Sequence, residues 1–404
     1  MEVRLASAGK AMLPVVVSEH AGERVRAAAT TLAAYLGRIA GTEFAVKTGD
    51  GGSGIVVGLP GQFTALPFRP AFGKGPFDRE RYILRSGAGG VWLVGSTDLA
   101  VEHAVWDLLW RLGYRQFFPG ETWEVVPRTD PLKVAVDADE SPDFHARRIW
   151  YNWGMNWGYN VRPYNDWCAR NRAVKGFSLE SGHAYEDIIA SNRAAFDAHP
   201  EYFALVGGKR QPSKFCISNP GLRRLVAEDA ARRFRANPSL DSISMEPSDG
   251  GGWCECDACA RMGSVSDRAL SLANEVAAAV NALGLGEKYV GMYAYNEHSP
   301  PPNVKVHPRV IVSVATAFQR GGLTLDQIMD GWRSKGATLG IYDYFSVVVW
   351  DWNLPRRSRA AWPWELAKSI RHYHSRGAAR RGLPPSRAAS ADVEGPRGDV
   401  PSPP

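Results

Sequence analysis

Carboxylate, amide and aromatic side chains crowd into five short stretches of this sequence. They are YNWGMNWGYN (151–160), ESGHAY (180–185), EPSDGGGW (246–253), YAYNEH (293–298), and YDY (342–344) with the nearby WDWN (350–353). Aromatic rings stack on the faces of pyranose sugars, amides and carboxylates bind sugar hydroxyls, and two carboxyl groups can act as acid and base on a glycosidic bond. The combination predicts a carbohydrate site.

Three carboxylates are the catalytic candidates. Glu246 and Asp249 flank a proline and precede three glycines, which allow a ligand to approach the backbone closely, and Asp343 is the candidate partner. We expect the apolar Trp253 to raise the pKa of Glu246 or Asp249 by desolvation, so that one of them acts as the general acid. The alternatives are a turn-capping Asp249, a solvated Glu246 and an Asp343 held in a buried ion pair; Glu297 is next in line.

The same stretches supply the candidate substrate-binding residues. We expect His183 to donate or accept hydrogen bonds rather than act as a general base, because no neighbour in the sequence identifies a partner for it. Fourteen tryptophans exceed what a core needs, although core packing is the alternative for most of them. The predicted binding residues are Trp153, Asn156, His183, Trp253, Tyr295, Asn296, Tyr342 and Trp352.

Three clustered cysteines, Cys254, Cys256 and Cys259, form an incomplete metal signature. Cys216 could be the fourth ligand if the two segments lie side by side, and the four thiolates would then suit a structural zinc ion. Disulfides or free thiols are the alternatives. No other cofactor is expected, and no cysteine is expected to be catalytic, because no Cys–His pairing is suggested.

The elements that must position these residues alternate strand and helix patterns. This alternation implies parallel strands, and over about 230 residues it predicts a (β/α)8 barrel with its active site at the C-terminal ends of the strands. An open doubly wound sheet is the alternative, although no Gly-rich phosphate fingerprint follows the first strand. The candidate strands are 148–153, 174–179, 214–217, 242–245, 289–295, 310–316 and 338–345, and the helices between them are 221–235, 267–283 and 325–335.

A separate small α/β domain precedes this pattern. Helices are expected at 23–39 and 99–112, with strands at 15–18, 55–58, 81–85 and 91–95. We predict an α/β accessory domain over 1–135, with its boundary in the polar stretch 130–145, and a barrel over 145–377. Residues 378–404 have no apolar periodicity and are rich in Arg, Pro, Ser and Ala, which predicts a disordered or non-native tail and a barrel without its last strand.

The charge distribution argues against nucleic-acid binding. The net charge is +6, but residues 371–404 hold six arginines against three acids, so half of the surplus lies in the tail. No apolar run reaches the roughly 18 residues of a membrane span. The first residues, MEVRLASAGKAMLPVVV, have only a short apolar stretch broken by Pro14. We expect either a cytoplasmic protein or one whose secretion signal lies outside this chain.

Several longer motifs are distributed along the chain: YLGRIAGTEF, LVGSTDLAVEHAVWDLLWRLGYRQFFPGE, HPEYFAL, FCISNP, EPSDGGGWCECDAC and YVGMYAYN. They resemble a known bacterial family, the domain-of-unknown-function 4838 family, over nearly the whole chain to about residue 377. The resemblance implies a front domain similar to the accessory domain of α-glucuronidases and family 20 β-hexosaminidases, and a glycosidase-like barrel. The adjacent Asp-Glu pair of the hexosaminidases is absent from SMEPSDGGGW.

Two functions fit these sequence features. The first is a glycoside hydrolase acting on poly- or oligosaccharide by carboxylate acid/base catalysis. The second is a non-catalytic carbohydrate-binding protein that uses the same aromatic cleft. A scaffold that binds a protein partner is disfavoured by the chemistry of the loops.

Overall fold

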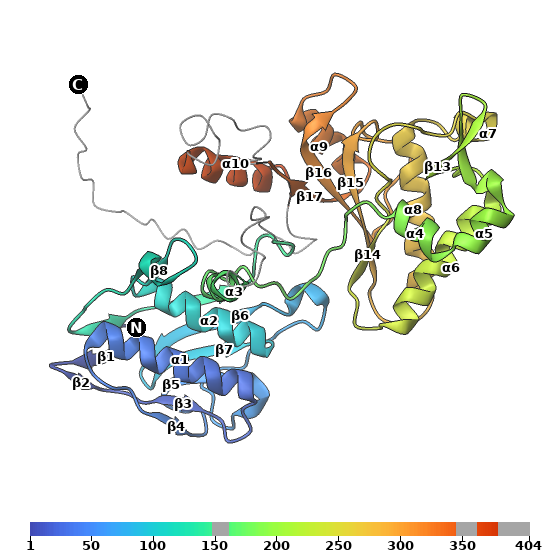
Figure 1. Ribbon diagram of the computed structural model, residues 1–404. Coiled ribbons are helices and arrows are strands. Elements are labelled where there is room, and N and C mark those ends of the chain that lie inside the picture. Colours follow the sequence, from blue (N-terminus) through green and yellow to red (C-terminus); the bar gives the residue numbers. More distant parts are fainter. Residues whose placement is uncertain (148–160, 345–361, 379–404) are drawn as a thin grey trace, which may run out of the picture.

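The computed structural model describes residues 1–147, 161–344 and 362–378, and these residues form two large hydrophobic cores. The first core is built by residues between Leu5 and Val136, and the second by residues between Ala184 and Ala378. Figure 1 shows the two cores in two adjacent bodies, each a mixed α/β structure. The boundary at 130–145 stays a prediction.

The N-terminal body is built on a six-stranded mixed sheet. Its four strands β4, β3, β5 and β7 pair in parallel, whereas β6 and β11 join the edge of β7 in antiparallel order. The order across the sheet is β11 (Asp137–Glu140), β6 (Tyr82–Gly87), β7 (Gly90–Gly95), β5 (Gly54–Gly58), β3 (Val15–Val17) and β4 (Val46–Thr48).

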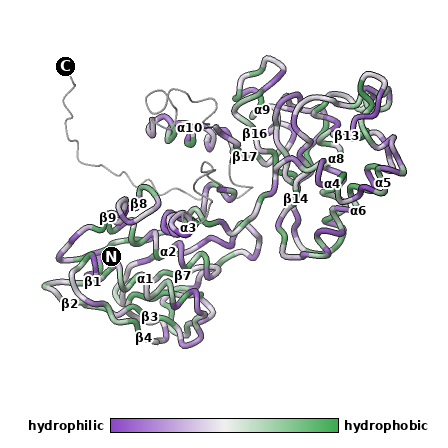
Figure 2. The backbone as a smooth tube through the Cα atoms, in the orientation of Figure 1, coloured by the Kyte–Doolittle hydropathy of each residue, from purple (hydrophilic) through white to green (hydrophobic). Residues whose placement is uncertain are grey.

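Both faces of this sheet are covered because successive strand residues point to opposite sides. Val15 and Val17 pack with the helices α1 (Glu23–Ala40) and α2 (Asp98–Arg111), whereas Val16 packs on the other face with aromatic residues of the 59–75 loop. In Figure 2 the hydrophobic colour follows β3, while α3 is largely hydrophilic. Local signals fix the helix ends: Thr97 caps α2, and Gly41 ends α1 in the left-handed conformation.

Smaller elements complete the N-terminal body, and three short helices begin the second body. The other described helices and strands before residue 203 are β1 (Val3–Ser7), β2 (Lys10–Ala11), η1 (Pro60–Gln62), η2 (Pro76–Asp78), β8 (Arg115–Gln116), η3 (Glu121–Trp123), β9 (Glu124–Val125), β10 (Leu132–Val134), α3 (Val161–Arg170), α4 (Tyr185–Ser191), α5 (Arg193–Ala198) and η5 (Pro200–Tyr202). Of these, α4, α5 and η5 belong to the second body and lead into its hairpin.

The second body contains a four-stranded parallel sheet in the order β14-β15-β16-β17. Capping boxes at Ser264 and Thr324 begin the helices α8 (Val265–Asn281) and α9 (Leu325–Ser334). The elements are β14 (Ser242–Ser244), β15 (Tyr289–Asn296), β16 (Val310–Gln319) and β17 (Thr338–Tyr342), with the helices α6 (Pro220–Ala236), α7 (Asp257–Arg261), α8 (Val265–Asn281), α9 (Leu325–Ser334) and α10 (Pro363–Ser375).

Within the described residues this sheet is not a closed barrel, and one of the predicted strands lies elsewhere. The segment predicted at 214–217 belongs to β13 (Lys209–Phe215), which pairs antiparallel with β12 (Phe203–Val206) in a hairpin of its own. Gly207 and Gly208, both with positive φ, form its two-residue turn. The predicted strand at 148–153 lies outside the described residues.

The segment predicted as the second strand, 174–179, forms no strand but runs beside β14. Side chains replace the backbone ladder: the Ser242 hydroxyl donates to the Ser178 carbonyl and accepts from the Glu180 N–H at 2.7 Å, and Asp241 accepts from the Ser178 N–H. A parallel bridge between His183 and Glu246 continues the pairing. Residues 174–179, predicted as the second barrel strand, therefore lie directly beside β14, which was predicted as the fourth.

At the other edge of the sheet, Ala378 forms an isolated parallel bridge with Leu339 of β17. The chain reaches this position through α10, whose Arg376 pairs with Asp326 and Asp330 of α9. An eighth barrel strand would begin here. The predicted loss of that strand concerns residues 379–404, which lie outside the described residues.

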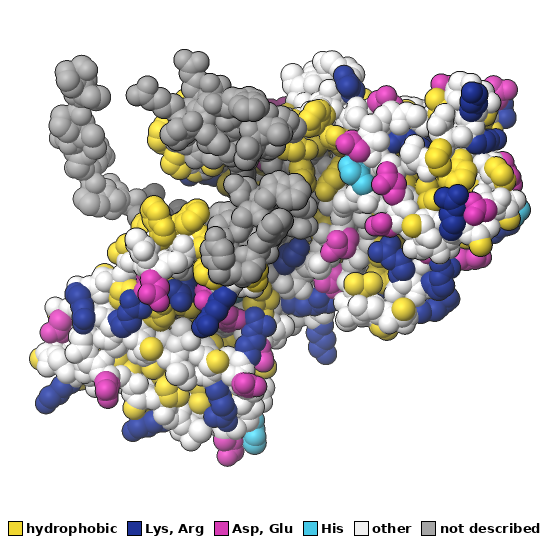
Figure 3. Space-filling view, viewed as in Figure 1, with side chains coloured by type: hydrophobic (Ala, Val, Ile, Leu, Met, Phe, Trp, Pro, Cys, Tyr) yellow, Lys and Arg dark blue, Asp and Glu magenta, His cyan; other side chains and the backbone are white. Residues whose placement is uncertain are grey.

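The two bodies meet at an aromatic and ionic joint. The ring centroid of Phe77, in the N-terminal body, lies 4.8 Å from that of Phe177 and 5.3 Å from that of Tyr289, both in the second body. Arg79 pairs with Asp241 at 2.8 Å. On the face shown in Figure 3, basic and acidic side chains are interspersed over both bodies. No helix among the described residues is both long enough and apolar enough to cross a membrane.

Candidate functional site

The candidate site lies where β14, β15, β16 and β17 end. Because the four strands are parallel, their C-terminal ends share one edge of the sheet and bring four loops together. The loop after β14 carries Glu246 and Asp249, β15 ends in Tyr295 and Asn296, and β17 leads into Asp343. The sequence stretches predicted to carry chemistry thus meet at one edge wherever the structure describes them.

Five aromatic rings form a connected chain across these strand ends. Tyr293 lies 5.1 Å from Tyr342, which lies 5.1 Å from Tyr344. Phe318 then links Tyr344, at 6.1 Å, to Tyr295, at 5.8 Å. Tyr295 and Tyr342 were predicted to bind substrate, whereas Phe318 was missed because it follows an unbroken apolar strand. The exposed Phe318 side chain is the kind of surface on which a sugar ring stacks.

Asp249 is an exposed carboxylate beside this chain of rings. Its Oδ1 accepts hydrogen bonds from the Gly250 N–H at 2.7 Å and the Tyr295 hydroxyl at 3.0 Å. Among the described residues, Oδ2 has no hydrogen-bond donor. One oxygen of Asp249 is therefore held in place while the other remains for an incoming group.

The pKa of Asp249 is lowered, so the predicted rise was wrong for this residue. Burial acts to raise the pKa, but the hydrogen bonds from Gly250 and Tyr295 and the nearby positive charge of Lys214 outweigh it. The described ring contacts of Trp253 are with other residues. Its ring is buried and lies against His298, at 5.7 Å, and the Lys214 ammonium, at 5.3 Å. Asp249 is thus an anion at neutral pH.

Lys214 binds the backbone of the Asp249 loop, the stretch between β14 and α7 that carries Asp249. Its side chain is buried, and its ammonium donates hydrogen bonds to the carbonyl oxygens of Ser248 and, at 3.3 Å, Asp249. Burial lowers the pKa of Lys214, against the opposing charges of Glu246 and Asp249. Sequence patterns did not single out this residue. The available signal was a lysine placed directly before the apolar residues at the end of a strand.

Glu246 is completely buried beneath the loop. Its Oε2 accepts a hydrogen bond from the Tyr293 N–H at 2.7 Å, and its Oε1 lies 2.9 Å from Nε2 of the buried His298. Both carboxylate oxygens are engaged, and the side chain ties the end of β14 to the end of β15. This geometry favours a positioning role for Glu246 over contact with substrate.

His183 and Asn296 lie at the edge of the same site. The Nδ1–H of His183 donates to the Pro247 carbonyl at 2.6 Å, so in the neutral form of this exposed ring Nε2 is the nitrogen that can accept a hydrogen bond. Asn296 accepts from Arg320 through Oδ1. Asn296 and Phe318 both have positive φ, at 49° and 61°, beside an irregularity in the β15–β16 register. Such conformations concentrate at functional sites.

Asp343 joins β17 to the last described helix. Its carboxylate accepts hydrogen bonds from the Thr316 hydroxyl at 2.6 Å, the Tyr344 N–H at 2.8 Å and the Tyr373 hydroxyl at 2.8 Å. These three donors are neutral groups. These contacts give Asp343 a positioning geometry at the base of the aromatic chain.

Three predicted binding residues, Trp153, Asn156 and Trp352, lie outside the described residues. A shallow hollow of about 650 Å³ lies at the opposite, N-terminal edge of the sheet, beside Asn281, His307 and Arg309. It contains none of the predicted residues, and in parallel sheets of this kind chemistry belongs to the other edge.

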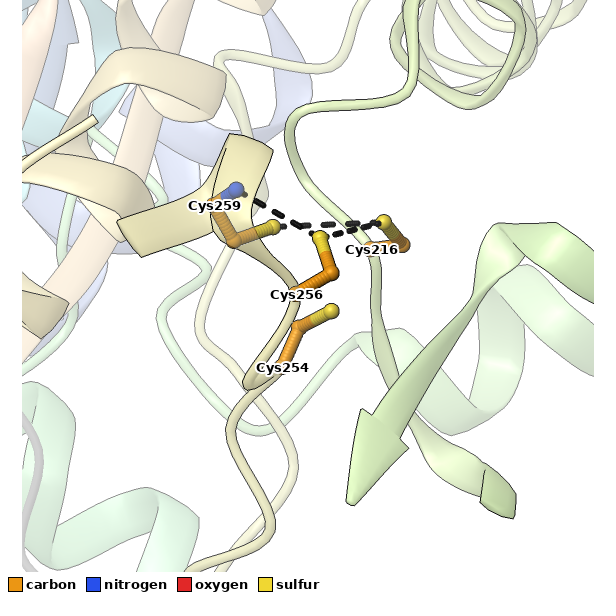
Figure 4. A group of neighbouring side chains, drawn as sticks. All are labelled: Cys216, Cys254, Cys256 and Cys259. Carbon is orange, nitrogen blue, oxygen red and sulfur yellow. Dashed lines mark hydrogen bonds between the residues drawn. The ribbon is translucent and has the colours of Figure 1, made fainter. Parts of the chain in front are cut away.

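The four clustered cysteines lie beside the candidate site and converge on one point. Cys216 follows β13, whereas Cys254, Cys256 and Cys259 follow Asp249 along the chain, and the four sulfur atoms all lie within 4.8 Å of one another (Figure 4). All four are free thiols. They are the candidate metal ligands among the described residues.

A protein-family model described as a domain of unknown function, DUF4838, matches residues 118–351, which is more than half of the chain. The chain belongs to the DUF4838 family. No curated protein matches this DUF4838 chain in sequence.

A solved structure of a glycoside hydrolase shares its fold. A family GH115 4-O-methyl-α-glucuronidase with specificity for decorated arabinogalactans matches with a TM-score of 0.53 and 14% identity, covering 94% of this chain and 54% of that one. This chain therefore spans about half of that enzyme. A GH20 β-N-acetylhexosaminidase from Streptomyces coelicolor A3(2) matches at a TM-score of 0.40 with 16% identity, covering 82% and 70%. At 14% identity the likeness to the α-glucuronidase shows the fold alone.

Proposed function

We propose that this DUF4838 protein is a glycoside hydrolase acting on poly- or oligosaccharides, with Asp249 as its anionic carboxylate. One observation carries the proposal: an exposed, ionised Asp249, held by Tyr295, stands next to five linked aromatic rings at the C-terminal edge of a parallel sheet. The glycosidase-like fold supports the same class of reaction.

Asp249 is suited to the negative partner of the carboxyl pair. Its lowered pKa keeps it ionised near neutral pH, as a nucleophile or a base must be. An ionised Asp249 also stabilises the positive charge that develops on the sugar ring in an oxocarbenium-like transition state. A general acid must instead hold its proton, so Asp249 is not the acid.

Glu297 is the proton donor in this proposal. It is exposed, and its Oε1 would lie only 3.4 Å from a Cβ atom added at Gly251, so its carboxyl group lies against the glycine turn that follows Asp249. The two carboxyl groups thus flank the Gly250–Gly252 turn. Gly250 and Gly252 have positive φ, at 71° and 86°, a conformation that favours glycine at both positions.

The surrounding residues hold substrate and carboxylates in place. The rings of Tyr295, Phe318 and Tyr344 offer faces for pyranose stacking, and Nε2 of His183 can accept a sugar hydroxyl. Lys214 and Glu246 act through the loop and the strand end that they bind. They are positioning residues.

The test is sugar release from aryl glycosides with good and poor leaving groups, over a panel of hexosides, N-acetylhexosaminides and glucuronides. Asp249→Asn should lower kcat/KM by roughly 10²- to 10⁴-fold on every substrate that the wild type cleaves. Glu297→Gln should lose as much on poor leaving groups and far less on good ones, because these depart without a proton.

Glu228→Gln, an exposed carboxylate on the outer helix α6, is the matched control and should retain full activity. If both site variants lose the same small amount on every substrate, the carboxyl groups only bind sugar. If the wild type binds oligosaccharides in calorimetry but releases no sugar from any substrate, the protein is the non-catalytic carbohydrate binder and the hydrolase proposal fails.

A further inference from the structure

We infer that Cys216, Cys254, Cys256 and Cys259 form a structural zinc site that anchors the far end of the Asp249 loop. The inference starts from where the thiols come from. Cys216 ends the β12–β13 hairpin, whereas the other three lie in the stretch between Asp249 and α8. Cys216 and Cys254 are 38 positions apart in the sequence (254 − 216). Two separate segments thus bring the four thiols to one point.

The distances between the sulfur atoms fit a single tetrahedral ion. Cys216 Sγ lies 3.7 Å from Cys256 Sγ and 3.9 Å from Cys259 Sγ. Zinc–sulfur bonds of about 2.3 Å in a tetrahedron place the sulfurs ~3.8 Å apart. All four sulfurs fall within 4.8 Å of one another, which leaves room for one ion and none for a multi-iron cluster. Four converging thiols also differ from the two separate pairs that disulfides need.

Backbone amides are already aimed at three of the sulfurs. The Leu205 N–H donates to Cys254 Sγ at 3.3 Å, the Ser218 N–H to Cys259 Sγ at 3.4 Å, and the Cys259 N–H to Cys256 Sγ at 3.4 Å. Such donors stabilise thiolates, and the groups around a metal orient its ligands in the same way. The Ser218 hydroxyl oxygen accepts from the Cys259 thiol at 3.2 Å and lies 3.6 Å from Cys216 Sγ.

The site is closed, as a structural zinc site must be. Cys216, Cys254 and Cys259 are buried, and the four thiols fill the tetrahedron without an open position for water or substrate. Binding converts four thiols into thiolates, releases their protons and leaves a doubly negative centre. The amide donors and Arg268, which binds the Cys254 carbonyl at 2.9 Å, offset that charge.

A zinc ion here would lock the hairpin to the Asp249 loop. The Glu255 N–H already donates to the Leu205 carbonyl at 2.7 Å, and the Glu255 carboxylate accepts from the Gly207 N–H at 2.7 Å. These two hydrogen bonds join the hairpin to the far end of a long loop without regular structure between β14 and α7. The metal would supply the bonds that the hydrophobic core cannot supply at this surface.

The experiment measures metal in the full chain purified without chelator. Elemental analysis should find about one zinc ion per chain, and protein produced in cobalt-supplemented medium should show the visible absorption bands of tetrahedral Co(II) bound to thiolates. Cys256→Ser should lose the metal and lower Tm by roughly 5–10 °C. Cys168→Ser, which changes the fifth cysteine on α3, is the matched control and should keep both.

The wild-type measurement stands even if a cysteine variant fails to fold. Zinc-free wild type with four titratable thiols, iron in place of zinc, or a disulfide found by mass spectrometry would each overturn the inference. None of these results depends on sugar hydrolysis, so the inference and the proposed activity fail separately.

Discussion

Two buried carboxylates, Glu80 at the joint between the bodies and Glu246 beneath the candidate site, have similar surroundings. Each accepts a backbone N–H at 2.7 Å, Glu80 from Gly176 and Glu246 from Tyr293. Each also faces a buried histidine, His103 at 3.5 Å and His298 at 2.9 Å. A buried carboxylate beside a histidine is therefore no sign of catalysis by itself.

The difference lies in what each carboxylate holds. Glu80 binds Arg147 and the Gly176 N–H, and so ties the N-terminal body to the segments that lead into the second. Its contact with His103 is not an ion pair, because burial, together with the charges of Arg147 and Arg172, lowers the pKa of His103 to about 3. Glu246 instead joins the ends of β14 and β15, where Asp249 and Tyr295 meet. The same chemistry stabilises the fold in one region and organises a site in the other.

The sharpest test of this comparison is Glu246→Ala. It leaves the Tyr293 N–H and His298 buried without their acceptor, so the free energy of unfolding should fall by about 3–5 kcal/mol. The end of β15 should also shift, lowering kcat/KM of the remaining folded protein by roughly 10²-fold. Urea denaturation and hydrolysis of the best aryl glycoside measure the two effects. Unchanged activity in the folded protein would remove Glu246 from the site.

Glu80→Ala should produce only the first effect. Arg147 and the Gly176 N–H lose their acceptor, and the free energy of unfolding should fall by about 3 kcal/mol. The candidate site is built by other strands, so kcat/KM of the folded protein should stay within about twofold of wild type. The same two assays apply. A loss of activity as large as that of Glu246→Ala would break the comparison.

The pH dependence of stability should reveal His103. Because its pKa is lowered to about 3 from 6.5, the unfolded chain takes up a proton between these values that the folded protein refuses. Stability should therefore be lost as the pH falls below 6.5, by about 1.4 kcal/mol per pH unit from this residue. In urea melts from pH 6.5 to 4, His103→Gln should make the free energy of unfolding depend less steeply on pH, by the contribution of up to one bound proton. Parallel slopes would show that His103 is protonated in the folded state.

The smallest effect is expected for Tyr295→Phe in the site region. Burial raises the pKa of Tyr295 to about 12, and its hydroxyl donates to Asp249. Removing this donor should raise the pKa of Asp249. The acid limb of the plot of kcat/KM against pH should then move to higher pH by roughly half to one unit. Stability should change by about 1 kcal/mol. An unmoved acid limb would mean that Asp249 does not control activity.

Much of the secondary structure could be predicted from the sequence. Helices α1, α2, α6, α8 and α9 and strands β14 to β17 lie within a few residues of their predicted positions, because apolar periodicity and capping residues are local signals. The alternation also predicted parallel strands, whose shared C-terminal edge brings Asp249 together with Tyr295 and Tyr342. The convergence of Cys216 with the other three cysteines was predicted from neighbouring third and fourth barrel strands, whereas the structure brings Cys216 there from the β12–β13 hairpin.

Other features depended on the tertiary structure. The strand predicted at 214–217 was placed in the main sheet, although the Gly207-Gly208 turn of a hairpin precedes it; a parallel strand and a hairpin strand share the same short apolar pattern. Residues 174–179 look like a strand, but the side chains of Asp241 and Ser242 bind them in place of a ladder. Pairing partners far apart in the sequence make these choices.

The division of labour between Glu246 and Asp249 was decided in the same way. The sequence by itself determined that two carboxylates, a glycine turn and a tryptophan would follow a strand. Only the fold buried Glu246 against His298, turned Trp253 away towards Lys214, and surrounded Asp249 with hydrogen-bond donors. Burial and hydrogen bonding shift a pKa in opposite directions for a carboxylate, and which effect dominates depends on neighbours that come from other strands.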